Sequence, residues 1–260
     1  MNRTRTWEVD EAESAPAADV ARRTLRRRLD AVWRELAAAC RSGDDAERVH
    51  QLRVASRRAL AAIDAFRDLL PAKQRAWFCK RLRRVRRAAG DARDLDVLTA
   101  RLAEERQAGR QASAATRARA RLVAMLSNRR VVSRQPIHEQ YERLSVVDWR
   151  AHVERLTEGI PARRGASTFG VYARRRFKAR LRRFFARADH RLREDAEIHR
   201  LRIEGKKLRY TFEIFARVFP ERVRAKCQKA LETLQEGLGE FTDHAAAADR
   251  LRRWAREPAA

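Results

Sequence analysis

The sequence holds few of the residues that build redox centres, metal sites or base-stacking surfaces. Only three cysteines occur among 260 residues, Cys40, Cys79 and Cys227, and they lie too far apart for a metal-ligand pattern. An odd number of scattered cysteines predicts reduced, buried thiols in a cytosolic protein rather than a disulfide framework. Aromatic residues make up 7% of the chain, and most fall at positions expected to face a core, which argues against a surface that stacks nucleotide bases.

Long hydrophobic runs are also missing. No apolar stretch approaches the 18 or more residues that typify a membrane-spanning helix, so no membrane association is expected. The first residues, MNRTRTWEVDEAESAPA, contain no apolar signal core, and we expect residues 1–17 to form a disordered tail. Together with the cysteine pattern, these absences predict a cytoplasmic location.

Acidic residues are outnumbered by basic ones. The chain has 61 Lys and Arg against 35 Asp and Glu, which gives a formal net charge of +26. Folding does not require such an excess, because self-repulsion destabilises a compact state. The excess therefore indicates a polyanionic partner. Arginine predominates over lysine, and its planar guanidinium can bind phosphate oxygens in bidentate fashion.

One stretch of the chain occurs twice. The copies are HQLRVASRRALAAIDAFRDLLP at residues 50–71 and HRLRIEGKKLRYTFEIFARVFP at residues 199–220. Every matching pair is separated by the same 149 positions, including Arg57 with Lys206 and Pro71 with Pro220. A gapless match of this length predicts an internal duplication.

Each copy has the 3.6-residue period of an amphipathic helix, with apolar residues on one face and a line of cations on another. Like charges at this spacing repel one another unless an anion lies across them. The alternative is an ordinary solvated basic face, with Asp64 and Glu213 as local partners. The recurrence of the row in register favours a functional role. The two rows comprise His50, Arg53 and Arg57, flanked by Arg58, and His199, Arg202, Lys206 and Arg209.

These residues resemble the CHAD family, the conserved histidine α-helical domain. The hallmark of that family is a histidine followed by L-R-V and paired basic residues in each of two repeats. The segment RDLDV at residues 93–97 and the segment at residues 239–243 resemble further family motifs. The resemblance covers about residues 18–256, nearly the whole chain.

The predicted fold class is all-α, with two pseudo-symmetric, duplicated four-helix bundles joined by a helical connector. Repeat one is expected over residues 18–108, the connector over 109–165 and repeat two over 166–256. The resemblance implies a central basic groove or pore between the halves. Helices are expected at residues 19–41, 46–70, 72–89, 91–108, 111–127, 129–145, 149–158, 168–190, 195–219, 221–238 and 241–256.

Two details of this prediction bear on the site. Gly90 and its counterpart Gly239 are expected to end one helix before the next begins. Asp91, Asp94 and Asp96 could suggest a metal site, but acidic residues also suit the first turn of a helix, near the positive end of its dipole. We prefer the helix-start interpretation, so no metal and no cofactor is expected.

The resemblance implies that inorganic polyphosphate is the ligand, and that the protein is targeted to polyphosphate granules. A polyphosphate-metabolising enzyme or a granule protein is a further candidate partner. Polyphosphate carries no bases, so its binding requires only charge and donors shaped for phosphate. The residues predicted to bind it are His50, Arg53, Arg57, Arg58, His199, Arg202, Lys206, Lys207, Arg209, Arg22, Arg26, Arg174, Arg175, Lys178, Lys80 and Arg84.

The basic composition is also compatible with two other function classes. The net charge alone would allow non-specific nucleic-acid binding, but no helix-turn-helix or zinc-finger spacing and no interleaved aromatics accompany it. A phosphohydrolase could use His50 or His199 as nucleophile or acid. The basic face, however, carries no carboxylate cluster that could hold a divalent metal. The expectation is therefore a binding protein and not an enzyme.

The scarcity of stacking aromatics generates a test of specificity. Labelled long-chain polyphosphate should be displaced by unlabelled polyphosphate more effectively than by single-stranded RNA, duplex DNA or heparin at equal anion concentration and physiological salt. The reason is that nucleic-acid readers gain ~1–3 kcal/mol per stacked base, a term this chain is not expected to supply. Equal or better displacement by RNA would instead favour the nucleic-acid alternative.

Overall fold

The structure is a computed structural model that describes residues 9–108, 114–161, 167–189 and 194–254. These residues form an all-α fold. Their β structure is limited to an isolated antiparallel bridge between Pro16 and Thr168. The chain divides into two compact units, which are described separately. The first unit comprises residues 1–21 and 161–260, and the second comprises residues 22–160.

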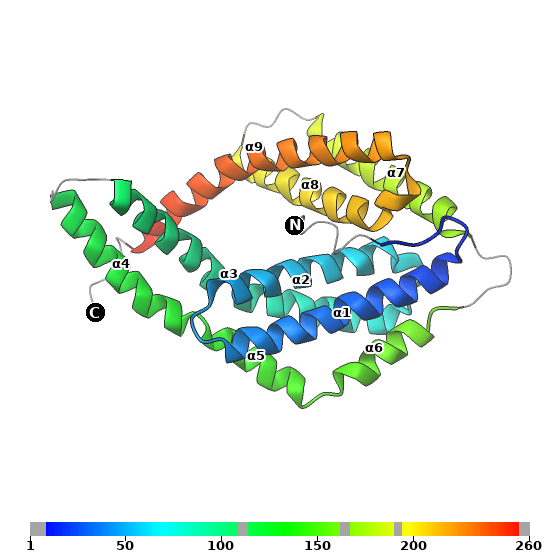
Figure 1. The fold of residues 1–260 in the computed structure, drawn as a ribbon, viewed down its shortest axis with the longest axis horizontal. Coiled ribbons are helices and arrows are strands. Elements are labelled where there is room, and N and C mark those ends of the chain that lie inside the picture. Colours follow the sequence, from blue (N-terminus) through cyan, green and yellow to red (C-terminus); the bar gives the residue numbers. More distant parts are fainter. Residues whose placement is uncertain (1–8, 109–113, 162–166, 190–193, 255–260) are drawn as a thin grey trace. The chain divides into compact units, whose positions relative to one another are not determined.

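The second unit is built around α2 and α3 (Figure 1). The carboxylate of Asp45 caps α2 by accepting from the backbone N–H of Glu47 at 2.8 Å. A short 3-10 turn, η2, then leads to Pro71, which precedes the first residue of α3 and suits a helix start. The elements are α1 (Ala17–Arg41), α2 (Ala46–Ala65), η2 (Arg67–Leu69), α3 (Ala72–Ala108), α4 (Ala114–Val132), α5 (Gln135–Ser145) and α6 (Trp149–Glu158).

The most important difference from the predicted fold lies in α3. The sequence predicted two helices separated at Gly90, but α3 is one continuous helix of 37 residues. Gly90 does not adopt the left-handed conformation of a helix end, because Gly43 is the one described residue with positive φ. A glycine within a helix costs about 1 kcal/mol relative to alanine and does not by itself end the helix.

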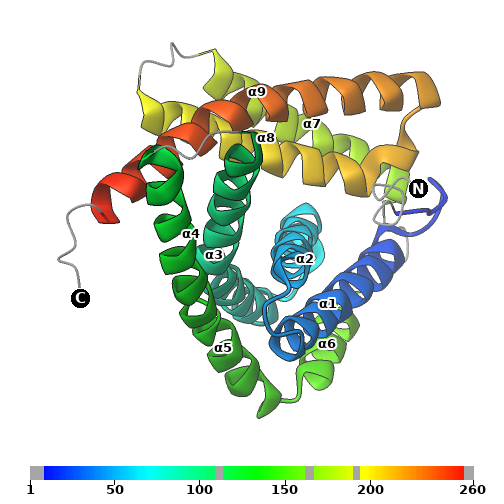
Figure 2. The same cartoon turned by 60° about the vertical axis from the view of Figure 1, so that its left-hand side comes forward.

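The helices of the predicted connector belong to the second unit, which ends at Ile160. Helices α4, α5 and α6 all contact α3, and Figure 2 shows them following one another along that unit. Aromatic rings tie α5 and α6 to the other helices of this unit. Trp33 of α1 stacks on both Tyr141 and Trp149, with ring centroids 5.5 Å and 5.9 Å apart. Trp77 of α3 stacks on His152, with centroids 3.8 Å apart, so this histidine packs against an aromatic ring.

A buried ion pair also fixes this arrangement. Asp96 of α3 is 2% exposed and accepts from Nε of Arg130 at 2.8 Å and from Arg134 at 3.4 Å. Asp44, in the turn before α2, contacts the same two arginines. The role of Asp96 is therefore to anchor α4 and the start of α5. Asp91, expected to cap a helix at this point, lies within the continuous helix α3.

The first unit repeats the order of helix, motif helix and long helix in α7, α8 and α9. Thr168 caps α7, and Glu194 forms a reciprocal capping box with Glu197 at the start of α8. The predicted helices at 221–238 and 241–256 are one helix, α9, so Gly239 interrupts nothing. Neither unit therefore has the predicted set of four helices per repeat. The elements are α7 (Phe169–Ala188), α8 (Asp195–Phe215), η3 (Ala216–Val218) and α9 (Glu221–Trp254).

The N-terminal residues of the first unit differ from the expected disordered tail. Val9 is 8% exposed, and residues 13–17 form backbone hydrogen bonds with residues 167–170. Residues 1–8 of the expected tail lie outside the described residues. In the described part of the chain, no helix combines the length and apolarity needed to cross a membrane.

The buried ion pair generates a prediction about stability. Asp96→Ala should lower the free energy of unfolding by about 3–5 kcal/mol, because it leaves the guanidinium of Arg134, 7% exposed, without its buried counter-charge. Chemical denaturation measures this change. The control is Glu139→Ala, which breaks a more exposed ion pair with Arg143 and should cost less than about 1 kcal/mol. Similar losses for the two variants would contradict the anchoring role.

Candidate polyanion site

The cationic row of α2 lies along its contact with α3. His50, Arg53 and Arg57 are each half-buried, whereas Leu52 and Ala59 on the apolar face are fully buried. Helices α2 and α3 run beside each other in both ribbon views (Figures 1 and 2). The row is therefore held against a second helix and is not a fully solvated face.

Arg53 makes the central contact of this row. Its Nη1 donates to the backbone oxygens of Ala89 and Gly90 on α3, at 3.3 Å and 3.1 Å. A Cβ placed on Gly90 would lie 3.5 Å from this Nη1, an ordinary van der Waals distance, so the guanidinium lies directly over the glycine. Burial lowers the pKa of Arg53, and Asp94 partly opposes that effect.

Two arginines of α3 that the predicted site omitted belong to the same cluster. Arg86 and Arg93 flank Gly90 at helical spacing, four residues before it and three after it. Burial lowers the pKa of Arg86, and the charge of Arg57 lowers it further. A sequence signal was present, because these arginines and Gly90 form one row on α3. Treating Gly90 as a break between helices concealed that row.

His50 is the titratable member of the cluster. Its pKa is lowered chiefly by burial and next by the charge of Arg93, with smaller effects of Arg57 and Arg53. Glu47 on the preceding turn opposes them. A protonated His50 would thus add a charge to a region that is already cationic, and a bound anion would favour that proton.

Arg57 has a hydrogen-bond donor that no other group in the described part of the protein uses. Its Nε is buried and has no hydrogen-bond partner, and no ion pair to its guanidinium occurs among the described residues. An unpartnered buried donor costs roughly 1–3 kcal/mol. Arg57 as a whole is half-buried, so the outer N–H groups of its guanidinium are the ones that can donate to an anion. His50, Arg53, Arg57, Arg86 and Arg93 are hereafter the cation cluster. They can bind phosphate oxygens through charge and directed N–H donors.

Several other predicted residues lie elsewhere in the second unit. Arg58 is 8% exposed, and its backbone oxygen accepts from buried Arg28 at 3.0 Å. Arg58 is therefore an interior residue that a bulky solvent-borne anion does not reach. Lys80 and Arg84 are exposed, but at 100° per residue they lie about 120–160° around α3 from Arg86.

Arg22 and Arg26 of α1 contact the end of α6. Arg22 donates from Nε to the backbone oxygen of Thr157 at 3.2 Å, and its Nη2 contacts the oxygen of Ile160. Arg26 donates to the hydroxyl of Thr157 at 3.5 Å. Cations at a helix C-terminus bind its free carbonyl groups and suit its dipole, so these two arginines tie α1 to α6.

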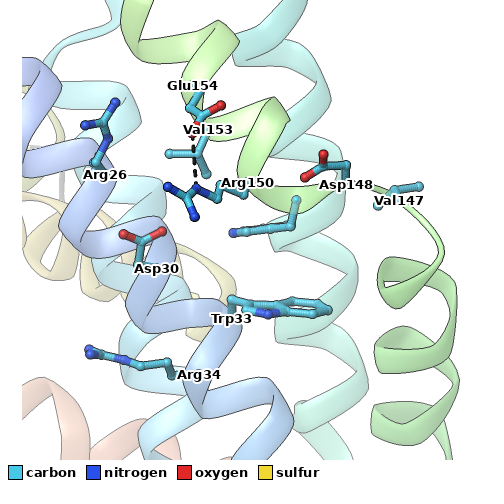
Figure 3. Close-up of a pocket in the computed structure, with 10 residues that line it drawn as sticks. Arg26, Asp30, Trp33, Arg34, Val147, Asp148, Arg150, Val153 and Glu154 are labelled. Atoms are coloured by element: carbon cyan, nitrogen blue, oxygen red, sulfur yellow. Dashed lines mark hydrogen bonds and ion pairs between the residues drawn. The ribbon is translucent and has the colours of Figure 1, made fainter.

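A cavity of about 580 Å³ lies beside this contact, between α1 and α6 (Figure 3). Its walls carry charges of both signs, and Arg150 pairs with Glu154 at 3.2 Å. Burial raises the pKa of Asp30 despite the arginines around it. Because its carboxylates balance its guanidinium groups, the cavity is a poor site for a polyanion. The charged lining residues are Arg26, Arg34, Arg150, Asp30, Asp148 and Glu154.

The first unit repeats the contact between motif arginine and glycine. A Cβ on Gly239 of α9 would lie 3.9 Å from Nη2 of Arg202 on α8, as a Cβ on Gly90 would lie near Arg53. Lys206 is half-buried and His199 is exposed on the same row. Arg209 differs, because it donates to Oε1 of Gln235 at 2.8 Å.

The remaining predicted residues of the first unit carry other contacts. Lys207 pairs with Glu204 at 2.6 Å. Arg174 of α7 pairs with Glu13 at 2.5 Å and also donates to the backbone oxygen of Val218 at 3.2 Å. The exposed Arg175 lies over the ring of Tyr172, and Lys178 is exposed on the same helix.

A comparison with protein-family models matches the CHAD domain over residues 23–252. The chain belongs to the CHAD domain family. The match spans both motif helices, α3 and most of α9, so the cation cluster and its counterpart in the first unit are parts of a CHAD domain. The family resemblance inferred from the paired H-x-L-R motifs is thereby confirmed.

Solved structures share this CHAD fold. The crystal structure of the CHAD domain from the plant Ricinus communis superposes with a TM-score of 0.75 at 23% identity, covering 95% of this chain and 82% of that chain. PptA from Streptomyces chartreusis superposes with a TM-score of 0.63 at 20% identity, covering 95% and 89%. At these identities the likeness concerns the fold alone. No curated protein matches the chain.

The environment of His50 generates a prediction about pH. Its pKa in the folded protein lies below the ordinary histidine value of about 6.5, so on acidification the unfolded chain takes up the proton first. Stability should therefore fall as pH drops from about 7.5 through 6.5 to about 5, and His50→Gln should reduce that fall in melting temperature. The control is His199→Gln, which makes the same substitution at the exposed matching position of the other copy. An unaltered fall in His50→Gln would refute the prediction.

Proposed function

We propose that this CHAD domain binds inorganic polyphosphate through the cation cluster of α2 and α3 and the matching row of α8. The observation that carries the proposal is Arg57, a half-buried cation with an unpartnered Nε beside four other cationic positions. Such a cluster is costly while it is empty, because its members repel one another and burial weakens their hydration. A chain of phosphates removes both costs by supplying charge and acceptors along the row.

The distribution of aromatic rings supports polyphosphate over nucleic acid. In the second unit, Trp33, Trp77 and Trp149 are engaged with one another, with neighbouring rings or with His152. Rings used for internal packing are not available for stacking bases. The arginine-rich cluster supplies the donors that phosphate oxygens require, and CHAD family membership supports polyphosphate at the level of the family.

The sequence duplication supports a further part of the proposal, that one polyphosphate chain contacts both motif helices. A long chain bound at one row raises the effective concentration of its own free phosphates at the other, which strengthens binding without any new kind of contact. The proposed anchors are Arg57 and Lys206, which occupy the same place in the two copies. We also propose that this binding brings the protein to polyphosphate granules, where a polyphosphate-metabolising enzyme or a granule protein is the expected partner.

The proposal predicts the effect of removing both anchors. Arg57→Ala combined with Lys206→Ala should weaken polyphosphate binding ten-fold to several thousand-fold, because each charged hydrogen bond contributes about 1.5–3 kcal/mol. Folding should persist, since removing clustered cations relieves repulsion. Titration with labelled long-chain polyphosphate and thermal unfolding measure the two effects. If one chain binds both rows, the two single substitutions should also be non-additive.

The matched control removes the same charge at two exposed positions outside the motif helices. Arg121→Ala combined with Arg155→Ala, on α4 and α6, should lower affinity only slightly through the change in net charge. Equal losses in the two double variants would mean that net charge alone drives binding. Wild-type affinity in the Arg57/Lys206 variant would show that the motif rows are solvated faces.

A further inference from the structure

Residues 9–16 form a segment that crosses the start of α7 in the first unit, here termed the acidic strap. It contains three carboxylates, Asp10, Glu11 and Glu13. Its backbone is anchored by hydrogen bonds from the N–H of Phe169 to the oxygen of Ala15 at 2.7 Å and from the N–H of Gly170 to the oxygen of Glu13 at 2.9 Å. Burial of Val9 adds an apolar anchor.

The carboxylate of Glu13 occupies Arg174, one of the arginines predicted to bind phosphate. The two side chains are each about half exposed, and their charged atoms are 2.5 Å apart. Arg174 also donates to the oxygen of Val218, so its guanidinium is held on two sides. Gly170 makes room for this arrangement, because a Cβ there would lie 3.1 Å from both the Glu13 carboxylate and Arg174.

Asp10 makes a second contact of the same kind. Its carboxylate lies 3.7 Å from Nε of Arg217, on the η3 turn that follows the motif helix α8. The backbone bonds and Val9 anchor the strap without these side chains. The two carboxylates are therefore not needed to anchor the strap. They instead pair with cations of α7 and η3.

We propose that the acidic strap is a built-in competitor of polyphosphate, with Glu13 and Asp10 occupying Arg174 and Arg217 until phosphates displace them. This inference rests on the proposed function. Exposed ion pairs contribute little to stability, so a multivalent polyanion can replace the carboxylates while the strap backbone stays bound. The strap then sets the affinity of the first unit, because each phosphate gained at Arg174 costs the Glu13 contact.

The test is Glu13→Gln, which removes the charge but keeps the shape of the side chain and the backbone bond to Gly170. Its affinity for long-chain polyphosphate should rise two- to five-fold, as expected for loss of a competing exposed ion pair. The control is Glu139→Gln, which makes the same charge change at an ion pair with Arg143 in the second unit. The control should raise affinity less than 1.5-fold, roughly the effect of one distant exposed charge.

The same substitution in an Arg174→Gln background distinguishes displacement of Glu13 from a general effect of net charge. In Arg174→Gln, polyphosphate binding should be weaker, and adding Glu13→Gln should leave it unchanged because the competition has lost its target. An equal gain in affinity in both backgrounds, or an equal gain from Glu139→Gln, would overturn the strap proposal while leaving the proposal of polyphosphate binding intact. Absence of binding by wild-type protein would instead overturn the proposed function, and the strap proposal with it.

Discussion

The donation from Arg53 to two carbonyl oxygens in the middle of α3 is the contact on which the cation cluster depends. Each of these oxygens can accept a helical N–H and still offer a second lone pair, so the arginine adds a bond without breaking the helix. The guanidinium lies directly over Gly90. The contact fixes the register of α2 on α3, and it thereby brings Arg57 and His50 beside Arg86 and Arg93.

This register brings partly buried cations close together, which is locally destabilising and must be offset by packing elsewhere. Burial lowers the pKa of Arg53, Arg86 and His50, which means that the folded environment disfavours their charged forms. The apolar faces of the same helices supply the compensation. Phe66 and Phe78 are fully buried, and each such side chain contributes about 1.5–3 kcal/mol. Repulsion between the cations and their partial loss of hydration are unfavourable in the folded protein, and a bound anion can offset both.

The sequence predicted the helical class, the motif helices and the family because all three depend on periodicity and repetition. It placed helix ends at Gly90 and Gly239, which lie inside the continuous helices α3 and α9, because a glycine within a helix looks the same in sequence as one that ends a helix. The burial of Arg58 and the position of Arg22 at the end of α6 could not be foreseen, because charge reveals neither burial nor the nearness of a helix end. Pairings such as Asp96 with Arg134 depend on helices far apart in the chain, which a single sequence does not place together.

The roles that the structure gives to individual cations explain why net charge is a poor guide to the site. Some arginines donate to backbone oxygens, as Arg22 does at the end of α6. Others pair with carboxylates, as Arg134 does with Asp96. These residues count toward the charge of +26, but their donors are engaged in holding helices together. In the proposed site, an external anion is bound by cations that folding has brought together without supplying an acceptor for every donor, as for Nε of Arg57. Arg174 is an intermediate case, because its acceptor Glu13 is an exposed side chain that a stronger anion can replace. Affinity should therefore follow the acceptors available to each guanidinium more closely than the number of basic residues.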